Sequence, residues 1–461
     1  MNLYEYVESI RHKKICVIGA GISNLPFIRL LLLSGCSVTV CDQKDESQIN
    51  QNDLDLIQRG AHYKLGANYL SDLDFDIIFR TPGLMPFEPH LEEARRRGCR
   101  VTSEMEVFFE LCPCRTIAIT GSDGKTTTST IIAELLKKEG YHVHLGGNIG
   151  KPLLCDLPFI RKEDFAVLEL SSFQLHSMFC RPDVAVITNI SPNHLDKHKD
   201  FEDYVQAKKN IFLNQESEGI LVLNEDDALC IRFGQETSSK VRSFSLKSEV
   251  RNGYYLQSGT IMRGSENGPE AVISAERIRI PGTHNIANYM AAFCATDDYV
   301  GQQTREYVAE HFGGVEHRLE LVRSLHGVDY INDSIGTSPT RTIAGLNALN
   351  RKPILILGGY DKHLAFDELG EKVCQRAKAV FLTGDTAEKI HAAILRAKSF
   401  RQDQLPVEVD PDFESCVKKA FASAREGDIV LLSPACAAFD RFRNFEERGR
   451  FFKKMVMELK E

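Results

Sequence analysis

Short apolar runs alternate with helix-forming stretches along nearly the whole chain. Four such runs are KICVIG (14–19), VTVCD (38–42), RTIAIT (115–120) and KPILILGG (352–359), and each leads into turn residues or a helical pattern. Apolar runs of this length, alternating with helices, are typical of parallel sheets covered by helices. The alternation predicts an α/β architecture and excludes coiled-coil, collagen-like and disordered classes.

Chain length and the grouping of these runs predict three domains in series. At about 150 residues per domain, 461 residues make about three domains, each able to bury a core. We expect a Rossmann-like domain over residues 1–103 and a second Rossmann-like domain over 315–461. Between them, residues 104–314 are expected to form a P-loop-type mononucleotide-binding domain with a parallel sheet. Three such units with clefts between them are typical of an enzyme with several substrates.

Residues 240–280 depart from this pattern. They contain short polar alternations, in the order SFSLKSE, GYYLQSGTIM and AVISAERIRI. These alternations predict small antiparallel strands attached to the central domain. The stretch that follows, PGTHNIANYMAAFCAT, predicts a helix with an asparagine-rich cap.

Charge, hydropathy and cysteine content narrow the class of protein. The net charge is −8 and the isoelectric point about 6.0, so we expect neither a nucleic acid partner nor an anionic membrane surface as partner. The longest purely aliphatic runs, of which Leu30–Leu33 is one, are far too short to span a membrane. The first residues, MNLYEYVESIRHKK, contain acids and no apolar stretch, unlike a signal peptide. Thirteen cysteines without a C-x-x-C pair indicate a reducing cytoplasm, and their spacing argues against a zinc site.

The segment TGSDGKTTT (120–128) has the context of a phosphate-binding loop, because it follows an apolar strand and opens a helix. Gly121 and Gly124 would let backbone N–H groups turn toward a triphosphate at the helix N-terminus. Lys125 would contact the β- and γ-phosphates, and Thr126 would bind Mg²⁺. The pattern is shorter than a full Walker A motif. The alternative is an ordinary glycine turn before a capped helix, but strand, GKT and helix together favour a nucleotide site.

GAGISN (19–24) is a weaker signal at the end of the first strand. It resembles the start of a dinucleotide-binding fingerprint, but Asn24 replaces the third glycine. Asp42 ends the next strand, where an acid that binds ribose would lie. The residues leave three readings open: a dinucleotide site, a nucleotide-sugar site, or a tight turn between strand and helix.

Three further residues of the central domain are candidates for metal chemistry. Glu169 ends an apolar strand in LELSSFQL (168–175), where a buried carboxylate needs a cation, either Mg²⁺ or a nearby Lys or Arg. His194 lies in a polar turn after a strand, and could bind metal or phosphate or simply face solvent. Lys208 lies on a predicted helix beside Lys209, and by itself indicates a solvated face.

The third domain places cationic and small residues at strand ends. Arg318 in VEHRLE, Asp333 in NDS and Lys362 in GGYDKH lie near strand boundaries, and SPACAAFDRFRNFEERG (433–449) begins as a strand-end loop. Taken singly, each of these residues could be an ordinary loop residue without a function. Together they lie at the expected mouth of a parallel sheet.

These motifs occur in the order found in Mur ligases, and the chain resembles that family over nearly its whole length. LELSSFQL and SPACAAFDRFRNFEERG resemble the members that add D-glutamate, and the shortened phosphate loop is also typical of the family. The resemblance implies ATP-dependent ligation of D-glutamate to the L-alanine carboxylate of UDP-N-acetylmuramoyl-L-alanine, through an acyl phosphate, in peptidoglycan precursor synthesis. It implies ATP as co-substrate, Mg²⁺, small-molecule partners and a cytoplasmic, monomeric enzyme.

The resemblance also implies roles for individual residues. For ATP these are Gly121, Ser122, Asp123, Gly124, Lys125, Thr126, Thr127, Asn285, Arg318 and Asp333. For the metal ions they are Thr126, Glu169, His194 and Lys208, with Lys208 carbamylated so that it offers a carboxylate-like ligand. For the UDP-sugar they are Ser23, Asn24, Asp42, Gln43, Gly83, Asn148, Ser171 and Gln174. For D-glutamate they are Thr337, Lys362 and Phe445.

Two positions depart from the family pattern. Ile335 stands where a lysine is frequent, and Ala438 stands where a serine is frequent, so the D-glutamate pocket loses a cation and a hydroxyl. Two other readings are kept. One is a different amide ligase of the same superfamily, such as another Mur ligase or a folylpolyglutamate synthase. The other is a nucleotide-binding or NAD-binding module without catalysis.

Overall fold

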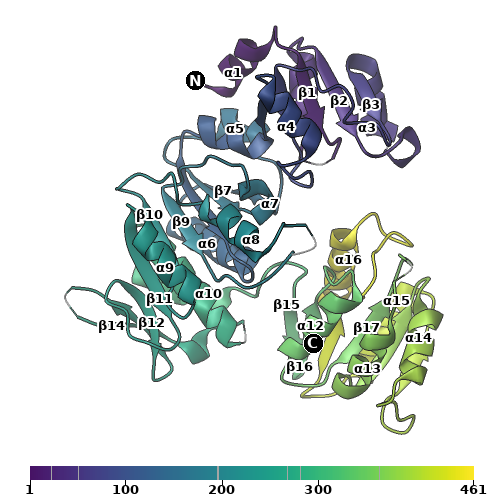
Figure 1. Cartoon of the computed structure of the whole chain (residues 1–461). Helices are drawn as coiled ribbons and strands as arrows, with labels where there is room; N and C mark the ends of the chain where they lie inside the picture. The colour runs from purple at the N-terminus through teal and green to yellow at the C-terminus, as the bar shows by residue number, and fades with distance from the viewer. Residues whose placement is uncertain are drawn as a thin grey trace. The chain divides into compact units, whose positions relative to one another are not determined.

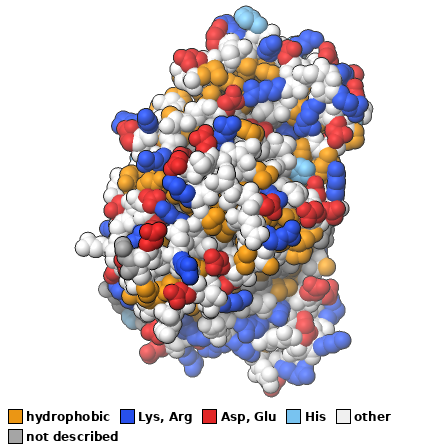
Figure 2. Space-filling model, turned by 60° about the vertical axis from the view of Figure 1, so that its left-hand side comes forward, with side chains coloured by type: hydrophobic (Ala, Val, Ile, Leu, Met, Phe, Trp, Pro, Cys, Tyr) orange, Lys and Arg blue, Asp and Glu red, His pale blue; other side chains and the backbone are white. Residues whose placement is uncertain are grey.

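The computed structural model describes residues 1–21, 23–49, 51–194, 197–266, 268–280, 282–362 and 364–460. The chain forms two compact units, Met1–Phe312 and Gly313–Glu461, and the first unit contains two of the three sheets (Figure 1). Among the helices that the structure describes, none is both long and apolar enough to cross a membrane. On the face shown in Figure 2, acidic and basic side chains are interspersed with small apolar groups.

The N-terminal sheet has five parallel strands in the order β3-β2-β1-β4-β5. Its strands are β1 (Ile15–Ile18), β2 (Val38–Asp42), β3 (His62–Leu65), β4 (Ile77–Phe79) and β5 (Arg100–Thr102). Its helices are α1 (Leu3–Ile10), α2 (Leu25–Leu33), α3 (Gln51–Gly60), α4 (Pro89–Arg96) and α5 (Glu104–Leu111), with a 3₁₀ turn at Glu46–Gln48. Strand β1 is apolar at every position because Ile15 and Val17 enter one core while Cys16 and Ile18 enter another.

The central sheet has nine strands in the order β14-β13-β12-β11-β10-β9-β6-β8-β7. They are β6 (Arg115–Thr120), β7 (Val143–Gly147), β8 (Phe165–Glu169), β9 (Val184–Ile187), β10 (Ile220–Asn224), β11 (Lys240–Ser245), β12 (Gly253–Gln257), β13 (Thr260–Gly264) and β14 (Glu270–Ser274). The helices are α6 (Lys125–Glu139), α7 (Ser172–Leu175), α8 (Phe201–Lys209), α9 (Ala228–Glu236), α10 (Thr283–Thr296) and α11 (Gln302–His311), with 3₁₀ turns at Leu154–Phe159 and Ala275–Arg277.

The expected antiparallel addition is correct only for its last strands. Strands β12, β13 and β14 pair antiparallel, but β11, which contains the start of SFSLKSE, pairs parallel with both β10 and β12. Helix α9 connects β10 to β11, and a helical crossover returns the chain in the same direction. The asparagine-rich cap is also wrong, because Gly282 is the N-cap of α10 and no side chain of the described residues caps that end. Asn285 and Asn288 instead hydrogen-bond each other inside the helix.

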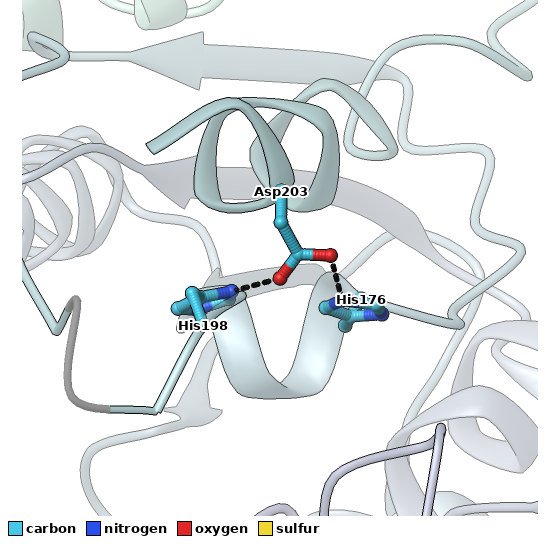
Figure 3. A group of neighbouring side chains, drawn as sticks. All are labelled: His176, His198 and Asp203. Atoms are coloured by element: carbon cyan, nitrogen blue, oxygen red, sulfur yellow. Dashed lines mark hydrogen bonds and ion pairs between the residues drawn. The ribbon is translucent and has the colours of Figure 1, made fainter. Parts of the chain in front are cut away.

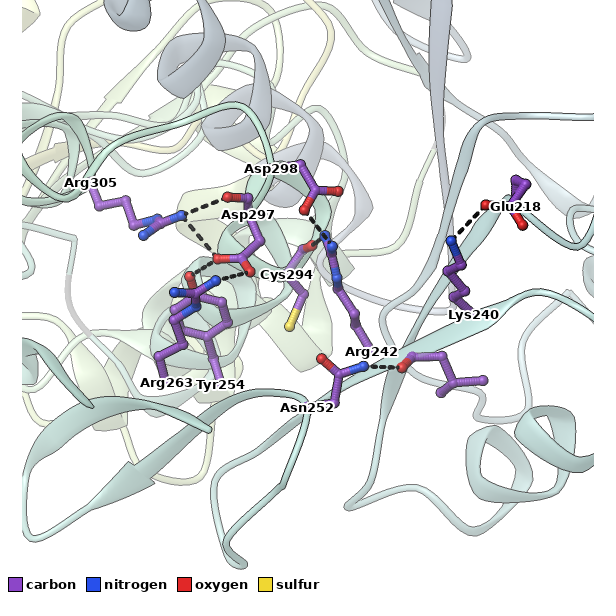
Figure 4. A network of polar contacts seen from close by, with 11 residues as sticks. Glu218, Lys240, Arg242, Asn252, Tyr254, Arg263, Cys294, Asp297, Asp298 and Arg305 are labelled. Atoms are coloured by element: carbon purple, nitrogen blue, oxygen red, sulfur yellow. Dashed lines mark hydrogen bonds and ion pairs between the residues drawn. The ribbon is translucent and has the colours of Figure 1, made fainter. Parts of the chain in front are cut away.

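A polar network fastens the antiparallel strands to the helices beside them (Figure 4). Asp297, at the end of α10, accepts hydrogen bonds from Tyr254 of β12, Arg263 of β13 and Arg305 of α11. The neighbouring Asp298 pairs with Arg242 of β11, and its side chain is 46% exposed. Asp297 therefore joins three elements, whereas Asp298 makes a surface ion pair.

The C-terminal unit has one sheet, ordered β15-β16-β20-β17-β18-β19, in which β15 pairs antiparallel with β16 and the other pairs are parallel. Its strands are β15 (Glu320–Leu325), β16 (Val328–Asn332), β17 (Ile354–Gly358), β18 (Ala379–Thr383), β19 (Val407–Val409) and β20 (Ile429–Leu432). Its helices are α12 (Pro339–Ala348), α13 (Asp367–Arg376), α14 (Ala387–Arg396), α15 (Phe413–Ser423) and α16 (Phe445–Met457). The predicted α/β class is confirmed by these parallel-dominated sheets.

Candidate active site

The glycine loop between β6 and α6 has a backbone that requires its two glycines. Gly121 has φ +147°, and a Cβ there would lie 1.9 Å from the hydroxyl oxygen of Thr188. Gly124, the N-cap of α6, has φ +79°, and a Cβ there would lie 2.4 Å from Oδ1 of Asn288. Both positions combine a left-handed conformation with a close neighbour, so the loop tolerates no side chain at either.

The segment that follows β9 holds the loop in place. The hydroxyl of Thr188 donates to the Asp123 carbonyl at 2.6 Å, and the Asp123 N–H donates to Oδ1 of Asn189 at 3.0 Å. The hydroxyl of Ser122 donates to the Ser191 carbonyl at 2.8 Å. The Lys125 ammonium folds back onto the loop and donates to the Gly121 and Ser122 carbonyls, both at 2.9 Å. Thr126 and Thr127, on the first turn of α6, are partly buried.

Glu169 lies at the carboxyl end of β8, the strand beside β6, and is 2% exposed. Its Oε1 accepts a hydrogen bond from Nδ2 of Asn148 at 2.9 Å, whereas its Oε2 is buried and has no hydrogen-bond partner among the described residues. Among the described side chains, no lysine or arginine forms an ion pair with it. An unpartnered carboxylate oxygen in a buried, polar strand end fits a bound divalent cation.

Lys208 of α8 lies beside the glycine loop and is 1% exposed. The expectation of a solvated face was therefore wrong for this residue. Its ammonium donates to the Thr120 hydroxyl at 3.1 Å and to the Gly121 carbonyl at 2.7 Å. Burial, and then the nearby Lys125 cation, hold the pKa of Lys208 well below its ordinary value. The structure thus brings together the loop, Glu169 and Lys208.

His194 lies in the turn after β9, where it is exposed and has φ +55°. Its ring centroid is 5.2 Å from that of Phe173, the second residue of α7, the helix that follows β8. Sequence reasoning missed Tyr204 of α8, whose hydroxyl is 2.9 Å from the Ser122 hydroxyl. It also missed Thr188 and Asn189, although polar residues directly after an apolar strand were visible in the sequence.

A cavity of about 200 Å³ lies beside Asn148, lined by residues from both the N-terminal and the central sheet regions. Four of the residues predicted to bind the UDP-sugar line it: Ser23, Asn24, Asn148 and Gln174. Arg80 and Glu104, which the sequence did not indicate, line it as well. Arg80 is 1% exposed and donates to the Phe173 carbonyl and the Ser177 hydroxyl.

The other four residues predicted to bind the UDP-sugar do not line this cavity. Asp42 accepts hydrogen bonds from the backbone N–H groups of Ala20 and Lys44. Gln43 and Gly83 are exposed in turns, and Ser171 accepts a hydrogen bond from the Gln174 N–H at the start of α7.

In the C-terminal unit, Asp333 is 5% exposed and accepts a hydrogen bond from the Ser433 hydroxyl at 2.6 Å. Burial raises its pKa to about 6. Arg318 is exposed in the segment before β15. Asn285 belongs to the first unit, in α10.

The residues predicted to bind D-glutamate are spread over this unit. Thr337 is partly buried before α12, Lys362 is exposed after β17, and Phe445 begins α16. This unit contains a cavity of about 390 Å³, and none of these three residues lines it. Its lining includes Asp440 and Arg448, and Arg448 is 1% exposed and donates to the carbonyls of Ser334, Cys436 and Ala437. Sequence reasoning did not single out Arg448.

A parallel sheet with a glycine loop at the start of a helix defines the mononucleotide-binding α/β class of proteins. Residues 119–296 match the Mur ligase middle domain, and residues 317–436 match the Mur ligase glutamate ligase domain. The chain belongs to the Mur ligase family.

Similar proteins cover the chain from end to end. It is 45% identical over 460 residues to UDP-N-acetylmuramoylalanine–D-glutamate ligase from Clostridium botulinum strain 657, covering 99% of both chains. It is 45% identical over 463 residues to the protein of the same name from Ruminiclostridium cellulolyticum, covering 100% of this chain and 99% of that one. The fold is similar to that of UDP-N-acetylmuramate–alanine ligase from Thermotoga maritima, with a TM-score of 0.56, 18% identity, and 97% and 100% of the two chains covered.

Proposed function

We propose that the protein joins D-glutamate to the L-alanine carboxylate of UDP-N-acetylmuramoyl-L-alanine at the expense of ATP, in peptidoglycan precursor synthesis. The observation that carries this proposal is the convergence of the glycine loop, Glu169 and Lys208 at the carboxyl ends of β6 and β8. The names of relatives that are 45% identical over 99% of the chain support the choice of substrates. We place the enzyme in the cytoplasm, where such precursors are made, and propose that it acts as a monomer.

The chemistry explains why a phosphate site is needed. A carboxylate resists attack by an amine because its leaving group would be an oxide. Transfer of the γ-phosphoryl group of ATP to a carboxylate oxygen releases ADP and gives an acyl phosphate. The D-glutamate amine then attacks the carbonyl carbon, and phosphate leaves from the tetrahedral intermediate as the nitrogen loses a proton. Positioning and cations that neutralise phosphate charge lower both barriers.

This chain's residues divide that work. Backbone N–H groups of the loop and the N-terminus of α6 would hold the phosphates, and Lys125 would move from the loop carbonyls to the transferred group. Thr126, Glu169 and His194 would bind Mg²⁺, which when bound neutralises phosphate charge. The cavity beside Asn148 and Gln174 would bind the UDP-sugar. Asn285, Arg318 and Asp333 would contact the nucleotide, and Thr337, Lys362 and Phe445 would contact D-glutamate.

Lys208 is proposed to carry a carbamate. Its lowered pKa favours the neutral amine, whose nitrogen can attack the carbon of CO₂ and lose a proton to give an N-carboxylate. The product replaces the buried amine by an anionic oxygen ligand near Glu169. Its negative charge attracts the Lys125 cation, which a protonated Lys208 would repel.

The test is phosphate release by the purified enzyme with ATP, Mg²⁺, UDP-N-acetylmuramoyl-L-alanine and one amino acid at a time. Release should depend on D-glutamate and should be absent with L-glutamate, L-alanine, L-lysine and diaminopimelate. Lys125→Ala serves as the negative control, because it removes the cation of the loop. Turnover with a different amino acid would identify another Mur ligase specificity, turnover with a folate would identify a folylpolyglutamate synthase, and NAD binding without turnover would reject a ligase.

A further inference from the structure

Asp203 holds two histidines at once, in a cluster that the ATP and metal assignments do not use (Figure 3). Its Oδ1 lies 2.9 Å from Nε2 of His176, and its Oδ2 lies 2.8 Å from Nδ1 of His198. The side chains of His176 and Asp203 are 18% and 15% exposed, and that of His198 is fully buried. We call His176, His198 and Asp203 the histidine clamp.

The clamp joins three segments that carry the candidate site. Asp203 is on the first turn of α8, whose last turn carries Lys208. His176 directly follows α7, the helix that begins three residues after Glu169. His198 belongs to the loop between β9 and α8, four residues after His194. One carboxylate therefore ties together the segments that contain all three of these proposed metal ligands.

His198 passes this restraint to its neighbours. Its Nε2 lies 2.9 Å from the Ser172 hydroxyl, and its ring stacks on Phe173 with the planes 13° apart. Phe173 in turn contacts the His194 ring. The His198 ring also packs against Tyr204 in a T-shaped arrangement, and the Tyr204 hydroxyl bonds to Ser122 of the glycine loop.

Two other roles for the cluster fit less well. Ser172, His198 and Asp203 are hydrogen-bonded in series, as are the serine, histidine and aspartate of a nucleophilic triad. However, Ser172 is 3% exposed and does not line the cavity beside Asn148. Two imidazoles and a carboxylate could also bind a transition metal. Here, however, each carboxylate oxygen is already paired with an imidazole nitrogen, and the remaining nitrogen of His198 is paired with Ser172.

An ionised carboxylate can only accept hydrogen bonds, so both imidazoles donate to it and their tautomers are fixed. Burial alone would raise the pKa of Asp203. The hydrogen bonds from His198 and His176 outweigh burial and hold this pKa below its ordinary value. The clamp is therefore an anion with two oriented donors.

We propose that Asp203 is a positioning residue for the ligase reaction: through His198 it fixes the Phe173–His194 contact and the Tyr204–Ser122 hydrogen bond, and so sets the metal ligands against the glycine loop. The proposal rests on the proposed function.

The test compares Asp203→Asn with Glu202→Gln. Both remove one carboxylate from the first turn of α8, but Glu202 is exposed and bonds only to Gln206 among the partners described. We expect Asp203→Asn to lower kcat about 10- to 100-fold and to raise the half-saturating Mg²⁺ concentration about tenfold, with KM for D-glutamate changed less than twofold. Glu202→Gln should leave all three unchanged. Circular dichroism and the unfolding midpoint show whether each variant is folded.

His198→Gln provides a second route that does not depend on Asp203→Asn folding. It should raise the half-saturating Mg²⁺ concentration by a similar factor. The double variant, which carries both substitutions, should lose no more activity than either single variant, because both substitutions interrupt the same series of contacts. Equal behaviour of Asp203→Asn and Glu202→Gln, or additive losses in the double variant, would overturn the proposal. Stoichiometric Zn²⁺ binding that Asp203→Asn abolishes would overturn it in favour of a metal site.

Calorimetric binding of Mg·ADP separates the two proposals. We expect Asp203→Asn to weaken it about tenfold relative to Glu202→Gln, whether or not the enzyme uses D-glutamate. Absence of D-glutamate-dependent phosphate release by the unmodified enzyme, with this binding difference intact, would reject the proposed function and keep the positioning role. Unchanged Mg·ADP binding would reject the positioning role alone.

Discussion

The side-chain amide of Asn148 donates to Oε1 of Glu169 across 2.9 Å, and the buried Oε2 has no partner in the part of the chain that the structure describes. Asn148 directly follows β7 and Glu169 ends β8, and these strands are neighbours in the sheet. The hydrogen bond thereby determines which carboxylate oxygen is available to a cation.

Removal of that amide should weaken metal binding. Asn148→Leu keeps the size of the side chain but no longer orients Glu169, so the half-saturating Mg²⁺ concentration for phosphate release should rise about 10- to 100-fold. Asn252→Leu is the control, since it removes an amide of another exposed asparagine that donates to the Val241 carbonyl. An unchanged Mg²⁺ dependence in Asn148→Leu would contradict the assignment of Glu169.

The glycine loop and the C-terminal end of α6 offer a matched pair of glycines, Gly121 and Gly140. Gly121→Ala places a methyl group 1.9 Å from the Thr188 hydroxyl, so nucleotide binding measured by calorimetry should be lost. Gly140→Ala, at φ +111° with open space around its Cβ, should lower the free energy of unfolding by about 1 kcal/mol and leave binding intact. Nucleotide binding by Gly121→Ala would show that the loop can open to admit a side chain.

Glu104 should make stability depend on pH. Burial raises its pKa to about 7, above the usual 4.5, while its Oε1 accepts the Leu154 N–H at 2.9 Å. The folded protein then holds a proton that the unfolded chain has lost, so stability falls as the pH rises from about 4.5 to 7. This contribution should amount to about 3 kcal/mol and vanish in Glu104→Gln, as urea unfolding at pH 5 and pH 8 would measure. Parallel pH profiles for the two proteins would refute it.

Lys208 and Lys209 are adjacent but differ in environment. Lys208→Ala should abolish phosphate release, and added short-chain carboxylates should partly restore it if they occupy the place of the carbamate. Lys209→Ala breaks the ion pair with Glu236 and should retain most activity. The measurement is phosphate release against acetate or formate concentration. Failure of every carboxylate to restore Lys208→Ala would count against carbamylation.

Asp297 and Asp298 should differ sharply in their contribution to stability. Asp297→Asn leaves the buried Arg305 guanidinium without its charge partner, which should cost about 3 kcal/mol of unfolding free energy. Asp298→Asn removes a half-exposed ion pair and should cost less than about 1 kcal/mol. Chemical denaturation of both variants gives the comparison, and equal costs would mean that Arg305 finds another partner or water.

The strands were the part of the fold that the sequence predicted best. VTVCD and RTIAIT coincide with β2 and β6 because their side chains are apolar on both faces of a parallel sheet. The direction of β11 could not be predicted, because it depends on the crossover made by α9 rather than on the residues of the strand. Strands β15 and β19, with partly exposed residues, lack such an apolar run.

The candidate site was predicted in outline, and its positioning contacts were not. TGSDGKTTT carries its own local signal, since strand, glycines and helix are consecutive. Lys208 reads as a surface lysine on α8, and its burial follows only from the contact with Thr120 and Gly121, more than eighty residues earlier. Likewise, nothing near Asp203 indicates His176, because the pair is formed by packing of α7 against α8.

The hydrogen bonds between the glycine loop and Thr188, Asn189 and Ser191 have a thermodynamic consequence. A loop that folds only around its ligand spends part of the binding free energy on its own conformational entropy. Here the segment after β9 already restrains residues 122 and 123 through hydrogen bonds with Thr188, Asn189 and Ser191. The loss of conformational entropy that orders the loop therefore occurs when the chain folds, before a nucleotide binds. Little of the free energy of the phosphate contacts is then needed to order the loop, and most of it contributes to the observed affinity.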